Sequence, residues 1–256
     1  MHVRYAALTN IGKLRIENQD AILVRGLVSA QDTSLSDQAI VGPGDPPLVF
    51  GVFDGMGGHA GGAIASRIAA LVVGAAPSPR TETELAERLV RANALIHEEA
   101  QRRPELAGMG ATAVVVSVSA DGFVVASVGD SAAFRVLGSS VGALTTPDRA
   151  PDPRRADAWL LTAALGPSSS VRPHTDVYPV AAPTRLVLAS DGLTDVVDGA
   201  NLRRIITAIE ETDDAALALT VAALDGGGPD NVSVIVLDLE PHQATGDTRH
   251  ATPAAS

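Results

Sequence analysis

The chain has 256 residues, of which 46% are hydrophobic and 19% are charged, and this is the composition of a globular protein. It contains no cysteine, which excludes disulfides, zinc–thiolate sites, iron–sulfur clusters and cysteine nucleophiles. The formal net charge of −11 disfavours nucleic acid and anionic membranes as partners. No apolar run is long enough to cross a bilayer and no secretion signal precedes the first strand, so we expect a cytoplasmic protein.

The first part of the chain predicts strands followed by two helices. Three segments rich in β-prone or apolar residues predict strands: 3–9, 20–25 and 48–53. The polar segment 29–47, with its Gly-Pro and Pro-Pro steps, predicts a long loop. Apolar residues at helical spacing predict helices over 59–76 and 83–103, which Pro77 and Pro79 separate.

The second part predicts more strands and two further helices. Strands are predicted for 111–118, 123–128, 132–137, 141–144, 185–189 and 232–239. Asp121-Gly122 predicts a hairpin turn, and 146–173 predicts an irregular segment with a short helix over 156–163. Helices are predicted for 202–209 and 214–224. This order predicts an α+β fold, most simply two sheets with helices outside them.

Aspartates stand at the ends of the predicted apolar strands. Asp20 opens one predicted strand, and the aspartates that follow or precede another directly or within two residues are Asp54, Asp130, Asp191 and Asp230. If the strand ends converge, the carboxylates share one cleft and repel one another unless a cation binds there. Oxygen donors without thiolates favour Mg²⁺ or Mn²⁺, and this many carboxylates favours more than one ion. Taken singly, each Asp-Gly pair is more typical of a turn, as at Asp121-Gly122.

Short strings of residues surround these aspartates. They are Arg15-Ile16-Glu17-Asn18-Gln19-Asp20, Val52-Phe53-Asp54-Gly55-Met56-Gly57-Gly58-His59, Gly110-Ala111-Thr112-Ala113, Val128-Gly129-Asp130-Ser131, Leu161-Thr162-Ala163-Ala164-Leu165-Gly166, Ser190-Asp191-Gly192-Leu193-Thr194-Asp195 and Asp230-Asn231-Val232-Ser233. In this order they resemble the motifs of the metal-dependent protein phosphatases, the type 2C serine/threonine family, in its bacterial form. Because the strings occur in register from residue 15 to residue 233, the resemblance is specific.

The resemblance implies a four-layer α-β-β-α sandwich with a binuclear metal centre between the two sheets. It implies a single catalytic domain over 1–240 with a shortened flap near 146–173, and we expect a disordered tail over 241–256. The implied cofactors are two Mn²⁺ or Mg²⁺ ions and a third, weaker ion. The implied partners are phosphorylated proteins, namely serine/threonine kinases and their substrates, and the protein is expected to be a monomer.

The resemblance also implies a role for each aspartate. Asp54 would bridge the two ions, and the Gly55 carbonyl and Asp20 would complete the shell of one ion, Asp20 largely through water. The other ion would be held by Asp191 and Asp230. A third ion would be held by Asp130 together with Asp191.

Two further residues would act on the substrate in the hydrolysis of phosphoserine and phosphothreonine. Arg15 would bind the phosphate, since its planar guanidinium matches two phosphate oxygens. His59 would protonate the leaving alkoxide, while a water between the ions attacks phosphorus directly. The alternative interpretations give these residues no catalytic role: Arg15 would be a surface arginine paired with Glu17, and His59 would only begin a helix. Ser131 is expected to support a turn, and Asp148 to be merely solvated.

Other functions stay open at this point. The segment 55–60 fits G-x-G-x-x-[GA] of dinucleotide-binding enzymes, and 138–142 fits G-x-S-x-G of hydrolases. Neither has the required context, because a second helix follows the first motif and a strand and turn follow the second. A pseudophosphatase that serves as a scaffold, or a phosphatase for small phosphate monoesters, is the alternative function. All the metal aspartates are present, which favours an active enzyme.

Overall fold

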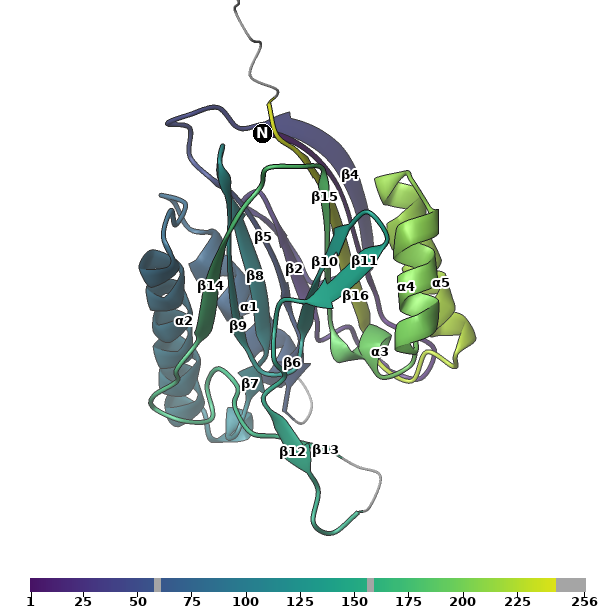
Figure 1. Cartoon of the computed structure of the whole chain (residues 1–256). Helices are drawn as coiled ribbons and strands as arrows, with labels where there is room; N and C mark the ends of the chain where they lie inside the picture. Colours follow the sequence, from purple (N-terminus) through teal and green to yellow (C-terminus); the bar gives the residue numbers. More distant parts are fainter. Residues whose placement is uncertain (58–60, 156–158, 243–256) are drawn as a thin grey trace, which may run out of the picture.

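The computed structural model describes residues 1–57, 61–155 and 159–242, and its centre is a pair of antiparallel β-sheets (Figure 1). The first sheet has the strand order β11 (Ser140–Ala143), β10 (Ala132–Leu137), β15 (Thr184–Ala189), β16 (Val232–Glu240), β1 (His2–Asn10) and β4 (Thr33–Ile40). The second has the order β14 (His174–Pro179), β9 (Gly122–Val128), β8 (Ala113–Val118), β5 (Leu48–Phe53), β2 (Ala21–Val24) and β3 (Leu27–Ser29).

The two sheets pack face to face through an apolar core. Phe50 and Ile22 of the second sheet belong to the same buried cluster as Leu186 and Ile235 of the first. The central strands are buried on both faces, since helices cover the outer sides, and their sequences are therefore continuous apolar runs instead of alternating ones. The sequence patterns over 113–118 and 232–239 reflect this double burial.

Helices form the two outer layers (Figure 1). The second sheet is covered by α1 (Gly61–Gly74) and α2 (Glu82–Arg102), which the 3₁₀ turn η1 (Pro104–Leu106) follows. The first sheet is covered by α3 (Asp191–Thr194), α4 (Gly199–Ala208) and α5 (Thr212–Asp225). A capping box begins α2, in which the Thr81 side chain accepts from the Glu84 backbone N–H and the Glu84 carboxylate accepts from that of Thr81.

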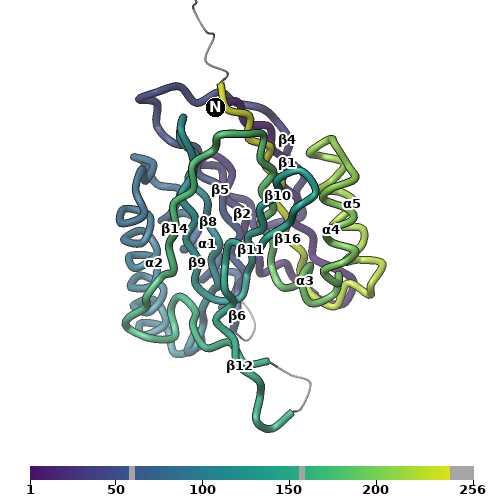
Figure 2. Tube along the Cα trace, viewed as in Figure 1, coloured from purple at the N-terminus to yellow at the C-terminus, as the bar shows by residue number. Residues whose placement is uncertain are grey.

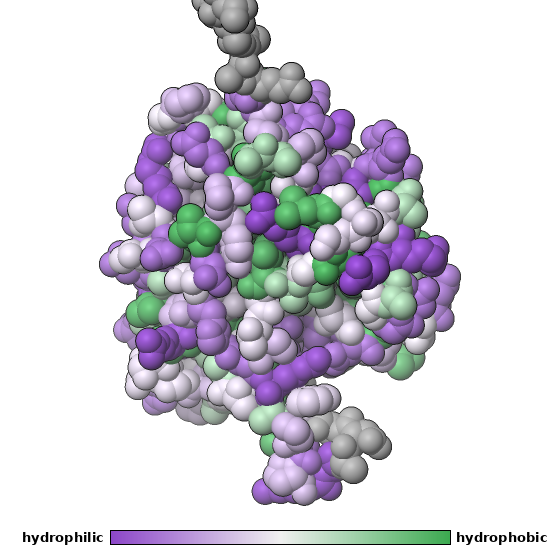
Figure 3. Space-filling model, viewed as in Figure 1, coloured by the Kyte–Doolittle hydropathy of each residue, from purple (hydrophilic) through white to green (hydrophobic). Residues whose placement is uncertain are grey.

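Two short ribbons lie at one end of the sandwich, as the Cα trace in Figure 2 also shows. In one, β6 (Gly55–Met56) pairs with β7 (Gly110–Ala111), and in the other β12 (Arg149–Pro151) pairs with β13 (Trp159–Leu161). The β12–β13 hairpin projects beyond the sheets, and the space-filling view in Figure 3 shows it standing out from the body. Among the described residues, no helix is both long and apolar enough to cross a membrane.

The four-layer α+β prediction is confirmed, and so are most of the predicted elements. The hairpin at Asp121-Gly122 joins β8 to β9, and Pro77 and Pro79 lie between the two helices of the second outer layer. Asp198 accepts from two backbone N–H groups at the start of α4. The predicted tail, from residue 243 onward, lies outside the described residues.

Two predicted segments are wrong. The expected loop over 29–47 contains β4, which pairs with β1 along its whole length. As an edge strand it has one open side and one solvent-facing surface, so polar residues suffice and only Leu35 packs against the core. The expected helix over 156–163 is contradicted at Trp159–Leu161, which form β13, while 156–158 lie outside the described residues. The edge strand β14 was not predicted, because His174–Pro179 is polar as well.

Candidate metal centre

The antiparallel sheets bring the predicted aspartates to one end of the sandwich. Asp20 directly precedes β2 and Asp54 directly follows β5, and these strands pair through Ala21 and Phe53. Because neighbouring antiparallel strands run in opposite directions, the start of one lies beside the end of the other. The same geometry in the first sheet places Asp191, after β15, near Asp230, before β16.

The carboxyl groups at this end interact strongly. Burial first, and then the charges of Asp20, Asp191 and Asp230, raise the pKa of Asp54 well above its ordinary value. Burial likewise raises the pKa of Asp191 to about 6 and that of Asp20 to about 7. Asp54 and Asp191 also share a side-chain hydrogen bond. Such a cluster is costly to keep ionised without a cation.

Asp20 has one carboxylate oxygen that is fully engaged and one that is not. Its Oδ2 accepts hydrogen bonds from Ser190 Oγ at 2.9 Å and from Ser233 Oγ at 2.6 Å. Its Oδ1 is buried and has no hydrogen-bond partner among the described residues. A buried, unpartnered carboxylate oxygen is rare in a native protein, and a metal ion or a metal-bound water satisfies it. The residues therefore fit the predicted ions.

Asp54 is held through its backbone. Its N–H donates to Thr112 Oγ1 at 3.2 Å, and its carbonyl accepts from the Thr112 N–H at 2.8 Å. Thr112 Oγ1 in turn lies 2.6 Å from Ser131 Oγ, so Ser131 supports the structure as expected and takes no other described part. At Gly55, a Cβ atom would lie 2.3 Å from the Gly62 carbonyl oxygen, so only glycine allows α1 to begin this close to the strand end.

Arg15 lies at the open side of the cluster. Its guanidinium donates to Asp230 Oδ2 at 2.5 Å, and this hydrogen bond is the main cause of its raised pKa. The charges of Asp54 and Asp191 contribute to the same shift, so the guanidinium lies close to the predicted bridging ligand. The alternative pairing with Glu17 is not seen, since Glu17 Oε1 accepts from the side chain of Gln19.

The structure departs from the sequence predictions at two residues beside Asp130. Asp148 is not merely solvated: its Oδ2 accepts from the Gly129 N–H at 2.9 Å and its Oδ1 lies 2.9 Å from His174 Nε2. Arg149, which the sequence did not single out, donates to Asp195 Oδ1 at 2.9 Å. Burial raises the pKa of Asp130, and the positive charge of Arg149 opposes that rise.

Protein side chains alone do not surround an ion at this end. Within residues 1–57, 61–155 and 159–242, no group of three His, Asp or Glu side chains has the geometry to hold one metal ion. The predicted shell of Asp54, Asp191 and Asp230 around one ion is therefore not formed by the described side chains in this arrangement, whereas the other predicted shell relies on a backbone carbonyl and waters. His59, the predicted proton donor, lies outside the described residues.

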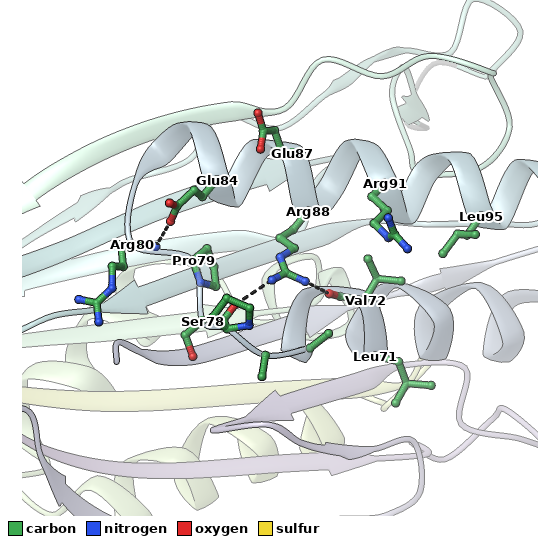
Figure 4. Close-up of a pocket in the computed structure, with 13 residues that line it drawn as sticks. Leu71, Val72, Ser78, Pro79, Arg80, Glu84, Glu87, Arg88, Arg91 and Leu95 are labelled. Carbon is green, nitrogen blue, oxygen red and sulfur yellow. Dashed lines mark hydrogen bonds between the residues drawn. The ribbon is translucent and has the colours of Figure 1, made fainter. Parts of the chain in front are cut away.

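A groove of about 920 Å³ lies elsewhere, between α1 and α2 (Figure 4). Arg88 crosses it and donates to the carbonyls of Pro77 at 2.7 Å and Val72 at 3.4 Å. Since α1 begins beside Gly55 and rises about 15 Å over the ten residues to Leu71, the groove is separate from the acidic cluster. None of the predicted site aspartates lines it.

Comparison with known proteins agrees with the fold. Residues 28–223, more than half of the chain, match the family model described as Protein phosphatase 2C. The chain belongs to the protein phosphatase 2C family. It is 30% identical over 213 residues to the serine/threonine phosphatase stp of Listeria innocua, a match that covers 75% of this chain and 84% of that protein.

Relatives within the protein phosphatase 2C family include the serine/threonine protein phosphatase PstP of Mycobacterium tuberculosis, which is 28% identical over 93% of this chain. The chain spans 45%, or about half, of the length of PstP. A crystal structure of PstP covers 94% of this chain with a TM-score of 0.76 and 26% identity. Another crystal structure, of the PstP catalytic domain with two manganese ions, superposes with a TM-score of 0.75 at 26% identity.

Proposed function

We propose that this protein hydrolyses phosphoserine and phosphothreonine in other proteins, with two Mn²⁺ or Mg²⁺ ions at the acidic end of the sandwich. The observation that carries the proposal is the buried carboxylate cluster assembled from both sheets, with one oxygen of Asp20 buried and unpartnered. Membership of the protein phosphatase 2C family and the manganese-bound PstP structure support it.

In the proposed centre, Asp54 would serve both ions. The Gly55 carbonyl and Asp20, the latter through water, would complete the shell of one ion. Asp191 and Asp230 would hold the other ion. Bound ions of this kind lower the pKa of a coordinated water and offset the charge of a phosphate dianion, and that is the chemistry they would supply here.

The chain's own residues orient the substrate. Arg15 is half exposed, with 52% of its side chain accessible, and holds Asp230 through one guanidinium nitrogen. Its long side chain can therefore turn towards an incoming phosphate and present two parallel N–H donors. Asp230 is then released to serve as a ligand. We propose His59 as the group that protonates the leaving seryl or threonyl oxygen, a step that contributes roughly 10²–10⁴-fold in comparable enzymes.

The proposed substrates are phosphorylated proteins, and the proposed opposing enzymes are bacterial serine/threonine kinases. Several relatives are named as serine/threonine phosphatases, which supports this substrate class. A monomeric state and a location in the cytoplasm stay predictions from the sequence.

The first test is hydrolysis of p-nitrophenyl phosphate and of a phosphoserine peptide in Mn²⁺ and in excess EDTA. We expect Mn²⁺-dependent turnover that Asp54→Ala and Asp191→Ala abolish, while Asp213→Ala, an exposed position on α5, retains it. A folded, Mn²⁺-binding protein without turnover on either substrate would contradict the proposal and indicate a scaffold. Turnover of small esters alone would indicate a small-molecule phosphatase.

A second test addresses His59. His59→Ala should slow the phosphoserine peptide more than p-nitrophenyl phosphate, because the nitrophenolate leaving group needs little help from a proton donor. An equal loss on both substrates would remove His59 from this role.

A further inference from the structure

The β12–β13 hairpin carries a guanidinium group to the outer side of the acidic cluster. Arg149, the first residue of β12, donates from Nη1 to Asp195 Oδ1 at 2.9 Å. Asp195 directly follows α3, and its backbone N–H donates to the carbonyl of Asp191, the first residue of that helix, at 2.8 Å. The side chain of Arg149 is 26% exposed, so the group is partly withdrawn from water.

Arg149 lies within electrostatic reach of three carboxylates. Besides Asp195, the charges of Asp130 and Asp191 act on its guanidinium. Arg149 is also the cation whose charge acts on Asp130. Asp130 and Asp191 are the residues to which the family resemblance of the sequence assigns a third, weaker ion, and Asp195 is their neighbour at the end of α3.

The base of the hairpin fixes this position. Asp148 is tied to Gly129 by two hydrogen bonds, one from the Gly129 N–H to Oδ2 and one from the Asp148 N–H to the Gly129 carbonyl, both 2.9 Å. Its backbone carbonyl accepts from the Thr162 N–H at 2.7 Å, and its Oδ1 lies 2.9 Å from His174 Nε2. Arg149 directly follows Asp148, and Asp130 directly follows Gly129. The hydrogen bonds between Asp148 and Gly129 therefore fix the backbone positions of Arg149 and Asp130 relative to each other.

The other strand of the hairpin covers the guanidinium. The ring of Trp159 lies 5.3 Å from Arg149 Cζ, within the range of a cation–π contact. Trp159 is the only tryptophan of the chain, and its side chain is 58% exposed. The Arg149 guanidinium thus contacts the carboxylate of Asp195 and the ring of Trp159, and these two contacts hold it in position.

We propose that Arg149 and a third divalent ion are alternative occupants of the Asp130 side of the centre, so that this chain holds two ions while Arg149 is in place. A guanidinium and a divalent ion beside the same carboxylates repel each other, and each supplies the positive charge that the carboxylates require. The inference rests on the proposed metal-dependent function. It adds that a residue of this chain controls the third ion.

The test measures metal binding to the full chain by Mn²⁺ electron paramagnetic resonance and by Mg²⁺ calorimetry. We expect Arg149→Gln to tighten the third ion at least tenfold and to leave the first two unchanged. Asp130→Asn in the same background should remove this gain. Arg154→Gln is the matched control, because it removes an arginine side chain of the same hairpin that makes no ion pair among the described residues, while the backbone N–H of Arg154, which donates to Asp152 Oδ1, is kept.

The single tryptophan gives an independent readout. In the wild-type protein, Trp159 emission should change over the Mg²⁺ range that fills the third site, as Arg149 leaves the ring, and Arg149→Gln should abolish that change. If Arg149→Gln binds the two tight ions but its affinity for the third ion stays within twofold of wild type, the inference is overturned and the proposed function is not. Absence of the tight pair in the wild type would overturn the proposed function as well.

Discussion

Replacing Asp191 by asparagine should stabilise the protein in the absence of metal. The carboxyl group of Asp191 is buried close to Asp54, Asp130 and Asp230, and its pKa rises from 3.8 to about 6, mainly through burial. Each tenfold change in proton affinity corresponds to about 1.4 kcal/mol, so keeping this group ionised above pH 7 costs the fold about 3 kcal/mol. An amide at this position has the same shape and carries no charge, and its oxygen can still accept from the protonated carboxyl group of Asp54.

In a domain of this size, 1 kcal/mol shifts the melting temperature by about 2–4 °C, so Asp191→Asn should melt about 6–12 °C above wild type in EDTA at pH 7.5. In saturating Mn²⁺ the order should reverse, because the variant lacks a ligand and loses the stabilisation that binding to the native state provides. Asp213→Asn on α5 is the control and should match wild type in both buffers. Differential scanning calorimetry measures the six melting temperatures of the three proteins in the two buffers. A variant that melts at or below wild type in EDTA would refute the reasoning.

Four further outcomes are expected, two on pH and one each for Thr112 and Arg185. The raised pKa values of Asp20 (about 7) and Asp191 (about 6) mean that the metal-free fold binds protons more tightly than the unfolded chain, so its stability should fall between about pH 4 and pH 7. Since ions bind the deprotonated carboxylates, the Mn²⁺-induced gain in melting temperature should grow over the same range, and a gain independent of pH would contradict this. Thr112→Val leaves the Asp54 N–H without an acceptor and should cost about 1–3 kcal/mol in urea unfolding, clearly more than Thr112→Ser. Arg185→Gln leaves Asp238 buried without its ion pair and should cost about 3–5 kcal/mol, whereas calorimetry should show unchanged Mn²⁺ affinity.

The positions of the site aspartates could be predicted because they depend on local sequence and on one rule of sheet geometry. Asp54 follows a continuous apolar run and Asp20 precedes another, and antiparallel pairing of Ala21 with Phe53 is enough to bring them together. Burial then follows from the outer helices, whose 3.6-residue periodicity is visible in the sequence. The fold class and the acidic end of the sandwich could therefore both be predicted from the sequence.

The surroundings of Asp130 could not be predicted from the sequence, because they depend on contacts between residues far apart in the chain, in a segment without periodicity. Asp148 lies among prolines, aspartates and arginines that look like a solvated loop. Its partners, Gly129 and His174, are 19 and 26 residues away in the chain. The edge strand β4 was missed for a related reason, since backbone pairing with β1 holds it and its side chains carry little apolar signal.

The origin of the aspartates in two different sheets has a consequence for the unliganded protein. Asp54 belongs to the second sheet, whereas Asp191 and Asp230 belong to the first, and the two sheets share no strand pairing. An ion held by all three would cross-link the layers at one end, in addition to the hydrogen bonds that Asp20 accepts there from Ser190 and Ser233, while mainly apolar packing joins the layers along the rest of their length. Removal of divalent ions should then increase amide exchange at that end, near β6 and α3, before it affects the middle of the strands. In a cell short of manganese or magnesium, this protein would lose the order of its acidic end well before it lost its fold.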